Sequence, residues 1–328
     1  MNAVQTSTRR ILRLGGGVIV VASTIAVVGT GPLARGVLAV SPTVILAAVT
    51  FTAVATLAAT WRWRVVSAAL GLPFTWAAGV AAYYRSQFLN SVLPGGVIGD
   101  VHRAYRQGRG AGTPIGAART VATERIAGQV VQGVVTVVVL SVLGLTEPFI
   151  GFAWIAAAAF LVAVLATAVA AATERGRRFV RREWSLLRVT FGSARASASI
   201  VAASVVVVVA HSATFVVACL AVGVTASPRE LVTLAVIALA AAALPLSIGG
   251  WGPREAASAS AFALVGLGAG VGLAASTAFG VLTLISVAPG LVVVIVEWAA
   301  ARAVAARTVA RPTAMTHPAD IRTEESLV

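Results

Sequence analysis

Two short clusters of polar, glycine and proline residues interrupt an otherwise apolar chain. The first runs from Arg85 to Arg103 and reads RSQFLNSVLPGGVIGDVHR; the second runs from Leu244 to Glu255 and reads LPLSIGGWGPRE. Each has a Leu-Pro pair, then a glycine-rich turn containing Ile-Gly, then an arginine nine residues after the proline. In membrane transporters, matched Gly/Pro interruptions in the two halves of a chain indicate a binding site between the halves.

The chemistry that these clusters offer is the binding of an anion. Proline ends the preceding helix and the glycines allow a tight turn, so we expect new helices to begin at Asp100 and Pro253. A helix start has unpaired N–H groups and a partial positive charge, which favour a phosphate. Arg103 and Arg254 would add charge-assisted contacts from the first turn of each helix. Asp100 is expected as an N-cap and Glu255 at the third helical position.

The predicted site has weaker members outside the two clusters, and an alternative reading. Glu124 and Arg125 open a predicted helix over Thr123–Leu145 and either pair with a charge of the clusters or stand at the surface. The clusters themselves also fit ordinary loop turns with arginines facing the cytoplasm. The predicted ligand-binding residues are Asn90, Pro94, Gly95, Gly96, Gly99, Asp100, Arg103, Glu124, Arg125, Pro245, Ser247, Gly249, Gly250, Gly252, Arg254 and Glu255. We predict no catalytic residue, no metal ligand and no cofactor.

Four further polar residues lie within apolar segments. Gln129 and Gln132 share one helical face and would line a polar groove or bond a neighbouring helix. His211 is expected to bridge helices, and Glu297 to snorkel or pair near the membrane interface. Polar residues at membrane depth are costly, so each is a candidate for function.

The elements that must position these residues are membrane helices. Of 328 residues, 59% are apolar and 11% are charged, whereas an ordinary soluble domain has about 25% charged residues. Several apolar runs approach or exceed the about 20 residues that cross a bilayer. They are Gly15–Thr30, Pro42–Thr60, Gln129–Leu145, Phe149–Ala171, Ala198–Val224, Leu231–Ile248 and Ala274–Val296. We predict an all-α polytopic bundle of about seven to eight spans, with both clusters as broken or re-entrant segments.

The charge pattern orients this bundle. All 25 basic residues are arginine and the net charge is +14. The loop Glu174–Arg195 holds seven arginines and two glutamates, which predicts that it, the N-terminus and the C-terminus are cytoplasmic. Arg62/Arg64 and the run after Arg103 both look cytoplasmic, so Phe74–Leu93 between them is a re-entrant, broken or interfacial helix that marks a cavity. Residues 1–308 form one predicted domain and 309–328 a disordered cytoplasmic tail.

At these motifs the sequence resembles the lysylphosphatidylglycerol synthase transmembrane-region family. The matching segments run from Phe88 to Ala104, from Glu124 to Gly128 and from Leu244 to Ala256, and Arg62-Trp63 supplies a typical Arg-Trp pair. The resemblance covers about residues 10–305. One departure is Ile98, which stands where family members often have the first glycine of a Gly-Gly-Asp ending.

The resemblance implies a lipid-handling protein of the bacterial inner membrane. Larger relatives fuse this region to a soluble synthase domain, and about thirty residues follow the last predicted span here, so a stand-alone membrane region is expected. The first hypothesis is a flippase-like translocator, or a protein that binds the anionic headgroup of a phospholipid or polyprenyl-phosphate lipid. The alternatives are a non-transporting partner of a lipid-modifying or glycosyl-transfer enzyme, or a membrane glycosyl- or phosphotransferase. Nucleic acid is not an expected partner.

Overall fold

The computed structural model describes residues 30–93, 96–143, 173–243 and 252–309. Within these ranges the chain is helical and contains no strand. The helices are α2 Gly31–Leu38, α3 Pro42–Ala69, α4 Trp76–Val92, α5 Ile98–Ala111, α6 Pro114–Val142, α8 Glu174–Phe191, α9 Ala194–Ala221, α10 Pro228–Ala242, α11 Pro253–Leu264, α12 Ala269–Ser286 and α13 Pro289–Val309. An all-α membrane bundle is confirmed for this part of the chain.

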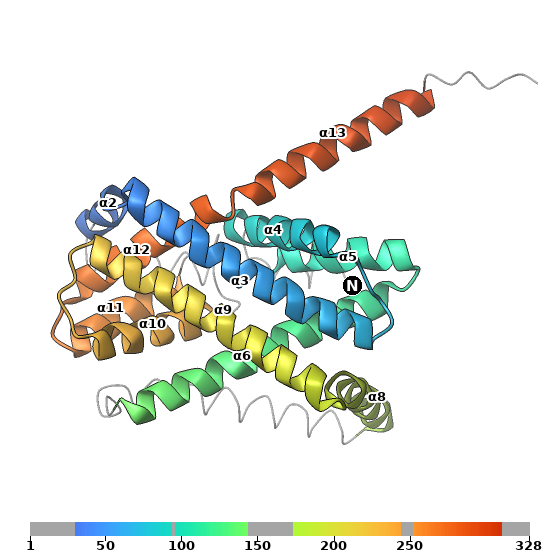
Figure 1. Cartoon of the computed structure of the whole chain (residues 1–328), viewed down its shortest axis with the longest axis horizontal. Helices are drawn as coiled ribbons and strands as arrows, with labels where there is room; N and C mark the ends of the chain where they lie inside the picture. The colour runs from blue at the N-terminus through green and yellow to red at the C-terminus, as the bar shows by residue number, and fades with distance from the viewer. Residues whose placement is uncertain (1–29, 94–95, 144–172, 244–251, 310–328) are drawn as a thin grey trace, which may run out of the picture.

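The long helices α3 and α9 pack side by side through the middle of the molecule (Figure 1). Small residues such as Ala48, Ala55 and Ala59 are buried, and small side chains let helix backbones approach closely where lipid provides no hydrophobic driving force. Thr56 and Thr60 donate their hydroxyl protons to the carbonyl oxygens one turn earlier, at 2.8 Å. These hydroxyls therefore need no other partner inside the bundle.

Four segments among the described residues are long and apolar enough to cross a bilayer: Pro42–Ala69, Pro114–Val142, Ala194–Ala221 and Ala269–Ala300. The last includes α12 and the first half of α13. The predicted spans Gly15–Thr30 (all but its last residue) and Phe149–Ala171 lie outside the described residues, as does the tail from residue 310. The total of seven to eight spans thus stays a prediction, while a multi-pass membrane protein is supported.

Three described helices begin at a proline that follows Ser or Thr, which is a typical helix-start signal, and two of them have a side-chain cap. Ser227 forms a full capping box with Glu230, whose carboxylate accepts the Ser227 N–H at 2.8 Å. The Ser41 hydroxyl accepts from the Val44 N–H ahead of a proline at the first position. Thr113 also precedes a helical proline, but its side chain makes no capping hydrogen bond.

Each polar cluster joins two short helices. The first cluster lies between α4 and α5, which pack against each other; the second lies between α10 and α11, which do the same. The four helices have 17, 14, 15 and 12 residues, all below the about 20 that a membrane crossing requires. This arrangement agrees with the predicted broken segments in both halves of the chain.

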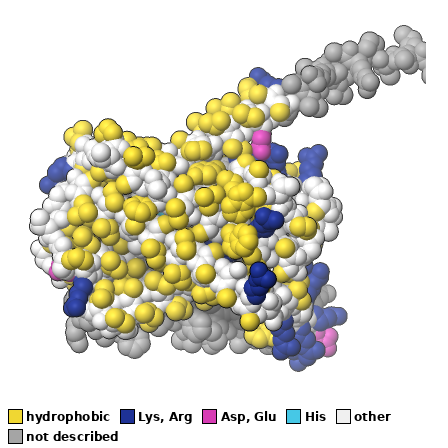
Figure 2. Space-filling view, in the orientation of Figure 1, with side chains coloured by type: hydrophobic (Ala, Val, Ile, Leu, Met, Phe, Trp, Pro, Cys, Tyr) yellow, Lys and Arg dark blue, Asp and Glu magenta, His cyan; other side chains and the backbone are white. Residues whose placement is uncertain are grey.

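The basic segment Glu174–Arg195, predicted as a loop, is mostly the helix α8. Thr173 caps it by accepting the Gly176 N–H at 3.0 Å. Its arginines alternate with apolar residues such as Trp184 and Leu187, which gives an amphipathic helix rather than a loop. Figure 2 shows apolar side chains over much of the viewed face, and arginines gathered most densely near α8.

Candidate functional site: a buried charge network beside a cavity

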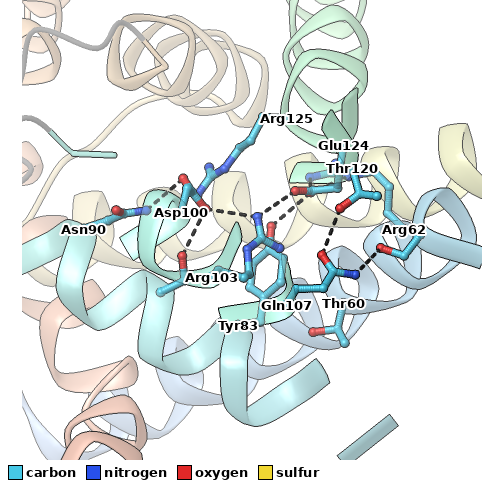
Figure 3. Close-up of polar contacts among 12 residues, drawn as sticks. Thr60, Arg62, Tyr83, Asn90, Asp100, Arg103, Gln107, Thr120, Glu124 and Arg125 are labelled. Atoms are coloured by element: carbon cyan, nitrogen blue, oxygen red, sulfur yellow. Dashed lines mark hydrogen bonds and ion pairs between the residues drawn. The ribbon is translucent and has the colours of Figure 1, made fainter. Parts of the chain in front are cut away.

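The carboxylate of Asp100 is the meeting point of α4, α5 and α6. Ser86 donates to its Oδ1 at 3.0 Å and Asn90 to its Oδ2 at 3.1 Å. Arg103 donates to Oδ1 at 3.0 Å, and Arg125 lies 2.6 Å from Oδ2 (Figure 3). Burial raises the pKa of Asp100, but these two guanidiniums outweigh it and leave the pKa below its usual value. Asp100 is therefore an ionised acceptor with all its near contacts filled.

Asp100 does not cap α5 as predicted. The helix begins two residues earlier, at Ile98, with Val97 at the cap position and Asp100 at the third helical position. Asn90 instead accepts the Gly99 N–H at 2.7 Å. The polar residues of α4 thus supply the hydrogen bond that a cap would have given, because the two short helices fold back on each other.

Glu124 is the second centre of the network and is fully buried. Its Oε1 accepts from Arg62 at 2.5 and 2.9 Å and from the Tyr83 hydroxyl at 3.1 Å. Its Oε2 accepts from Arg103 at 2.9 Å. The charges alternate along a chain of Arg62, Glu124, Arg103, Asp100 and Arg125 (Figure 3). The predicted pairing of Glu124 with a charge of the first cluster is confirmed. The alternative, a surface position at a helix start, is wrong because α6 begins ten residues before Glu124.

Arg103 is a positioning residue in this network. Only 1% of its surface is exposed, and its guanidinium lies 4.5 Å from the Trp63 ring and 4.4 Å from the Tyr83 ring. A planar cation between two aromatic faces gains from both. Arg103 is not among the residues that line the neighbouring cavity, so the predicted direct contact between Arg103 and an anion has no geometric support.

The described part of the second cluster forms a smaller ion pair. Arg254 pairs with Glu255 and donates to the Ser276 hydroxyl at 2.9 Å. Glu255 stands at the third helical position, as predicted, and its Oε2 accepts the Gly252 N–H at 2.6 Å. Gly252 has a φ of 135°, which favours glycine. The helix α11 begins at Pro253, again as predicted.

Residues of both clusters line one cavity of about 790 Å³. Such a volume is typical of ligand pockets, which range over about 300–1,000 Å³. Its described charged lining residues are Arg62, Arg125 and Arg254 against Asp100 alone. The cavity predicted from the broken segments is thus present, and its lining carries an excess of positive charge.

The arginines stand at two separate levels of this cavity. Arg62 donates to the Ser204 hydroxyl of α9 at 3.0 Å. The Arg254 guanidinium lies 5.0 Å from the Phe279 ring, which packs 5.5 Å from the ring of Phe215, also on α9. Phe215 lies eleven positions after Ser204 in α9, and this spacing corresponds to about 16 Å along the helix axis. We call Arg62 with Arg125 the first pole and Arg254 the second pole.

Several predicted site residues fall where the structure does not describe the chain. Pro94, Gly95, Pro245, Ser247, Gly249 and Gly250 all lie in residues 94–95 and 244–251. Asn90, Gly96, Asp100, Arg125 and Arg254 are among the cavity-lining residues. The cavity lining does not include Gly99, Arg103, Glu124, Gly252 or Glu255. All of these except Gly252 form a hydrogen bond or an ion pair with a lining residue.

Arg62 and Tyr83 belong to the site although the sequence did not indicate either as a site residue. Arg62 is 5% exposed and bonded to Glu124, and Tyr83 donates its hydroxyl proton to the same carboxylate. A charge buried inside a long apolar helix was the signal that would have found Arg62. Gln129 and Gln132 line the cavity as expected, and Glu297 pairs with Arg85 and Arg106. His211 also lines the cavity, while its expected role as a bridge between helices stays a prediction.

Comparison with known proteins gives one match. A family model described as the lysylphosphatidylglycerol synthase TM region matches residues 10–290. Searches of curated proteins and of solved structures found no match. The matched range contains both ends of the buried charge network and all the described cavity-lining residues, so the cavity belongs to the part of the chain that defines the family.

Proposed function

The chain belongs to the lysylphosphatidylglycerol synthase TM-region family, and from this membership we propose that it is a translocator for a lipid with an anionic headgroup. The headgroup phosphate would bind first at one arginine pole of the cavity and then at the other. The lipid is a phospholipid or a polyprenyl-phosphate lipid of the bacterial inner membrane. The observation that carries the proposal is the single cavity with arginines at two levels.

Two poles support transport more than static binding. A phosphate that binds at one level needs only one set of donors, but a phosphate that moves needs favourable positions along its path. The α9 residues next to the poles, Ser204 beside Arg62 and Phe215 on the side of Arg254, are about 16 Å apart along the helix axis, which is about half of the about 30 Å hydrocarbon thickness. Apart from the three arginines and Asp100, the described lining residues include no Asp, Glu, Lys or Arg, so they add no charge that would trap or repel a passing headgroup.

The carboxylates beside the poles explain how the arginines stay buried without a ligand. Each of Asp100, Glu124 and Glu255 is ion-paired with at least one arginine. An unpaired buried charge is costly, and the pairs remove most of that cost while leaving a net positive lining. Arg125 keeps about 40% of its side chain exposed. A phosphate in the cavity would bind on this exposed side.

The test is lipid translocation in reconstituted vesicles. Dithionite added outside the vesicles quenches fluorescent phosphatidylglycerol in the outer leaflet only. Fluorescent lipid in the inner leaflet is quenched when the protein moves it outward, so the rate of fluorescence loss measures translocation. We expect Arg125→Gln and Arg254→Gln each to slow the movement by at least about tenfold, because each removes a charge-assisted hydrogen bond. Arg229→Gln, at the exposed start of α10, is the matched control and should leave the rate unchanged.

A paired variant separates anion binding from simple neutralisation of Glu255. Arg254→Gln combined with Glu255→Gln removes the whole ion pair and leaves no unpaired buried charge. If the double variant moves lipid at the wild-type rate, Arg254 serves only to neutralise Glu255 and the second pole is not an anion site. If wild-type protein moves no lipid and retains none on purification, the partner-subunit alternative is favoured instead.

A further inference from the structure

We infer that the lipid carries an uncharged, hydroxyl-rich headgroup on its phosphate, and not a cationic aminoacylated one. This inference rests on the proposed function, because it names the substrate class of the same cavity. The phosphate would bind at the first pole and the hydroxyl groups along the neutral polar lining next to it. Glycerol, inositol and a sugar all supply such hydroxyl groups.

The lining of α6 provides the first argument. Arg125, Gln129 and Gln132 follow one another at helical spacing and all line the cavity. The distance from Arg125 to Gln132 is about 10 Å along the axis, which matches a phosphate followed by a small polyol or one sugar ring. Gln129 donates one N–H to the Ala243 carbonyl and Gln132 donates one to Thr136. Each carboxamide keeps its oxygen and a second N–H available for a hydroxyl group.

Unpartnered hydroxyl groups in the lining provide the second argument. Thr52 and Thr283 both line the cavity, and within the described part of the chain their Oγ1 atoms are buried with no hydrogen-bond partner. Thr52 is completely buried. Such orphaned polar atoms are rare in folded proteins, because leaving a donor unpaired is costly. Thr283 is partly exposed, so a hydroxyl group of a ligand beside it would satisfy its Oγ1 once the side chain turns toward the cavity. Thr52 has no exposed surface and contributes only the polar character of that wall.

The placement of the carboxylates provides the third argument. An ammonium group needs an available carboxylate or an aromatic cage. Among the described lining residues, Asp100 is the one carboxylate, and it already accepts from Ser86, Asn90, Arg103 and Arg125. An added ammonium would instead lie near Arg125, which is the most exposed of the three lining arginines, and like charges placed together oppose binding. The cavity therefore selects against a cationic headgroup.

The experiment is native mass spectrometry of the purified full chain offered equal amounts of lipids with identical acyl chains. The lipids are phosphatidylglycerol, its lysyl ester, and phosphatidic acid, which has the phosphate without the hydroxylated group. We expect phosphatidylglycerol to be retained at least about tenfold over its lysyl ester and more than phosphatidic acid. A separate arm offers a polyprenyl-phosphate hexose, and its retention over phosphatidylglycerol would identify a glycan lipid as the source of the same chemistry.

The Gln129→Ala/Gln132→Ala variant tests the hydroxyl subsite. Alanine is a better helix former than glutamine, so α6 should be kept. The variant should lose the preference for phosphatidylglycerol over phosphatidic acid while binding phosphatidic acid as wild type does. Gln107→Ala removes an amide that does not line the cavity and should keep the preference.

Three results bear on the inference in different ways. Equal or greater retention of the lysyl ester would overturn it and leave the proposed anion site standing, because the lysyl ester keeps the phosphate. An equal loss of all lipids in the glutamine variant would also overturn it. Retention of no lipid by wild-type protein would overturn the proposed function itself.

Discussion

At the scale of single residues, the buried charges form one alternating chain whose members depend on each other. Glu124 holds Arg62 through Oε1 and Arg103 through Oε2, and it has no exposed surface. Arg103 in turn shares Asp100 with Arg125. Arg125 is thus connected to the centre of the bundle through two carboxylates. A substitution at Glu124 should therefore alter the position of the Arg125 side chain, although the two side chains have different surroundings.

Glu124→Gln tests this dependence. The variant removes the negative charge between two buried guanidiniums, and loss of one partner of a buried ion pair costs about 3–5 kcal/mol. We expect a marked fall in the thermal unfolding temperature of the detergent-purified protein. Tryptophan fluorescence during heating measures this temperature. Glu183→Gln is the control, because its pair with Arg119 is partly exposed and such pairs contribute about 0–1 kcal/mol. Equal, small effects of both substitutions would show that the network is not a stabilising element.

The sequence identified most of the charged members of this site but not their roles. Arg103, Arg125, Arg254 and Asp100 stood out because charge is rare in apolar segments. Which arginine faces the cavity depends on how α5 rotates against α4 and α6, and no spacing within one helix contains that information. For this reason Arg103 was expected at the anion and lies instead between two aromatic rings.

At the scale of elements, the two short helices of the first half must approach very closely. A Cβ added at Gly99 would lie 2.0 Å from the Ser86 carbonyl oxygen, a distance that no packing adjustment of side chains relieves. The close approach places Asp100 beside Ser86 and Asn90. Gly99 therefore determines the geometry of the carboxylate that orients Arg125.

Gly99→Ala should push α5 away from α4 and disturb the first pole. We expect loss of retained anionic lipid and a lower unfolding temperature, with a destabilisation of about 1–3 kcal/mol, the range for overpacking. Gly110→Ala, in the same helix, meets nothing within 4 Å, and alanine there should stabilise α5 by up to about 1 kcal/mol. If both variants retained lipid and unfolded alike, the close contact of α4 and α5 would have no role in the site.

The elements were predicted better than their boundaries. The Leu-Pro and glycine signals located both helix breaks because proline and glycine act through the local backbone. Ser227-Pro228 likewise predicted a capping box that the structure contains. The helix α6 begins well before the predicted Thr123–Leu145 segment, since Arg119 and Glu124 mask its apolar pattern. Glu124 and Arg119 each form an ion pair with a residue of another helix, and these pairs make the two charges compatible with a membrane helix.

At the scale of the whole molecule, the arrangement of the bundle in the membrane depends on where its charged ends lie. The helix α9 is a single apolar span of 28 residues, so the segment before it and the segment after it must face opposite sides. The segment before it is the arginine-rich α8, and the segment after it is the turn that leads to Ser227. The positive-inside rule predicts that α8 lies on the cytoplasmic side.

Single-cysteine labelling tests this orientation. Cys219 is the one cysteine of the chain and is fully buried, so Cys219→Ala provides a background with little structural change. In that background, Ser185→Cys on α8 and Thr225→Cys after α9 both place a thiol at an exposed position. A membrane-impermeant maleimide should label Ser185→Cys only in inverted membrane vesicles and Thr225→Cys only in right-side-out vesicles. Labelling of both in one orientation would mean that α9 does not cross the membrane, and the reverse pattern would place the arginine-rich helix outside the cell. The reverse pattern would turn the cavity over relative to the two leaflets, and with it the leaflet that each arginine pole lies closer to.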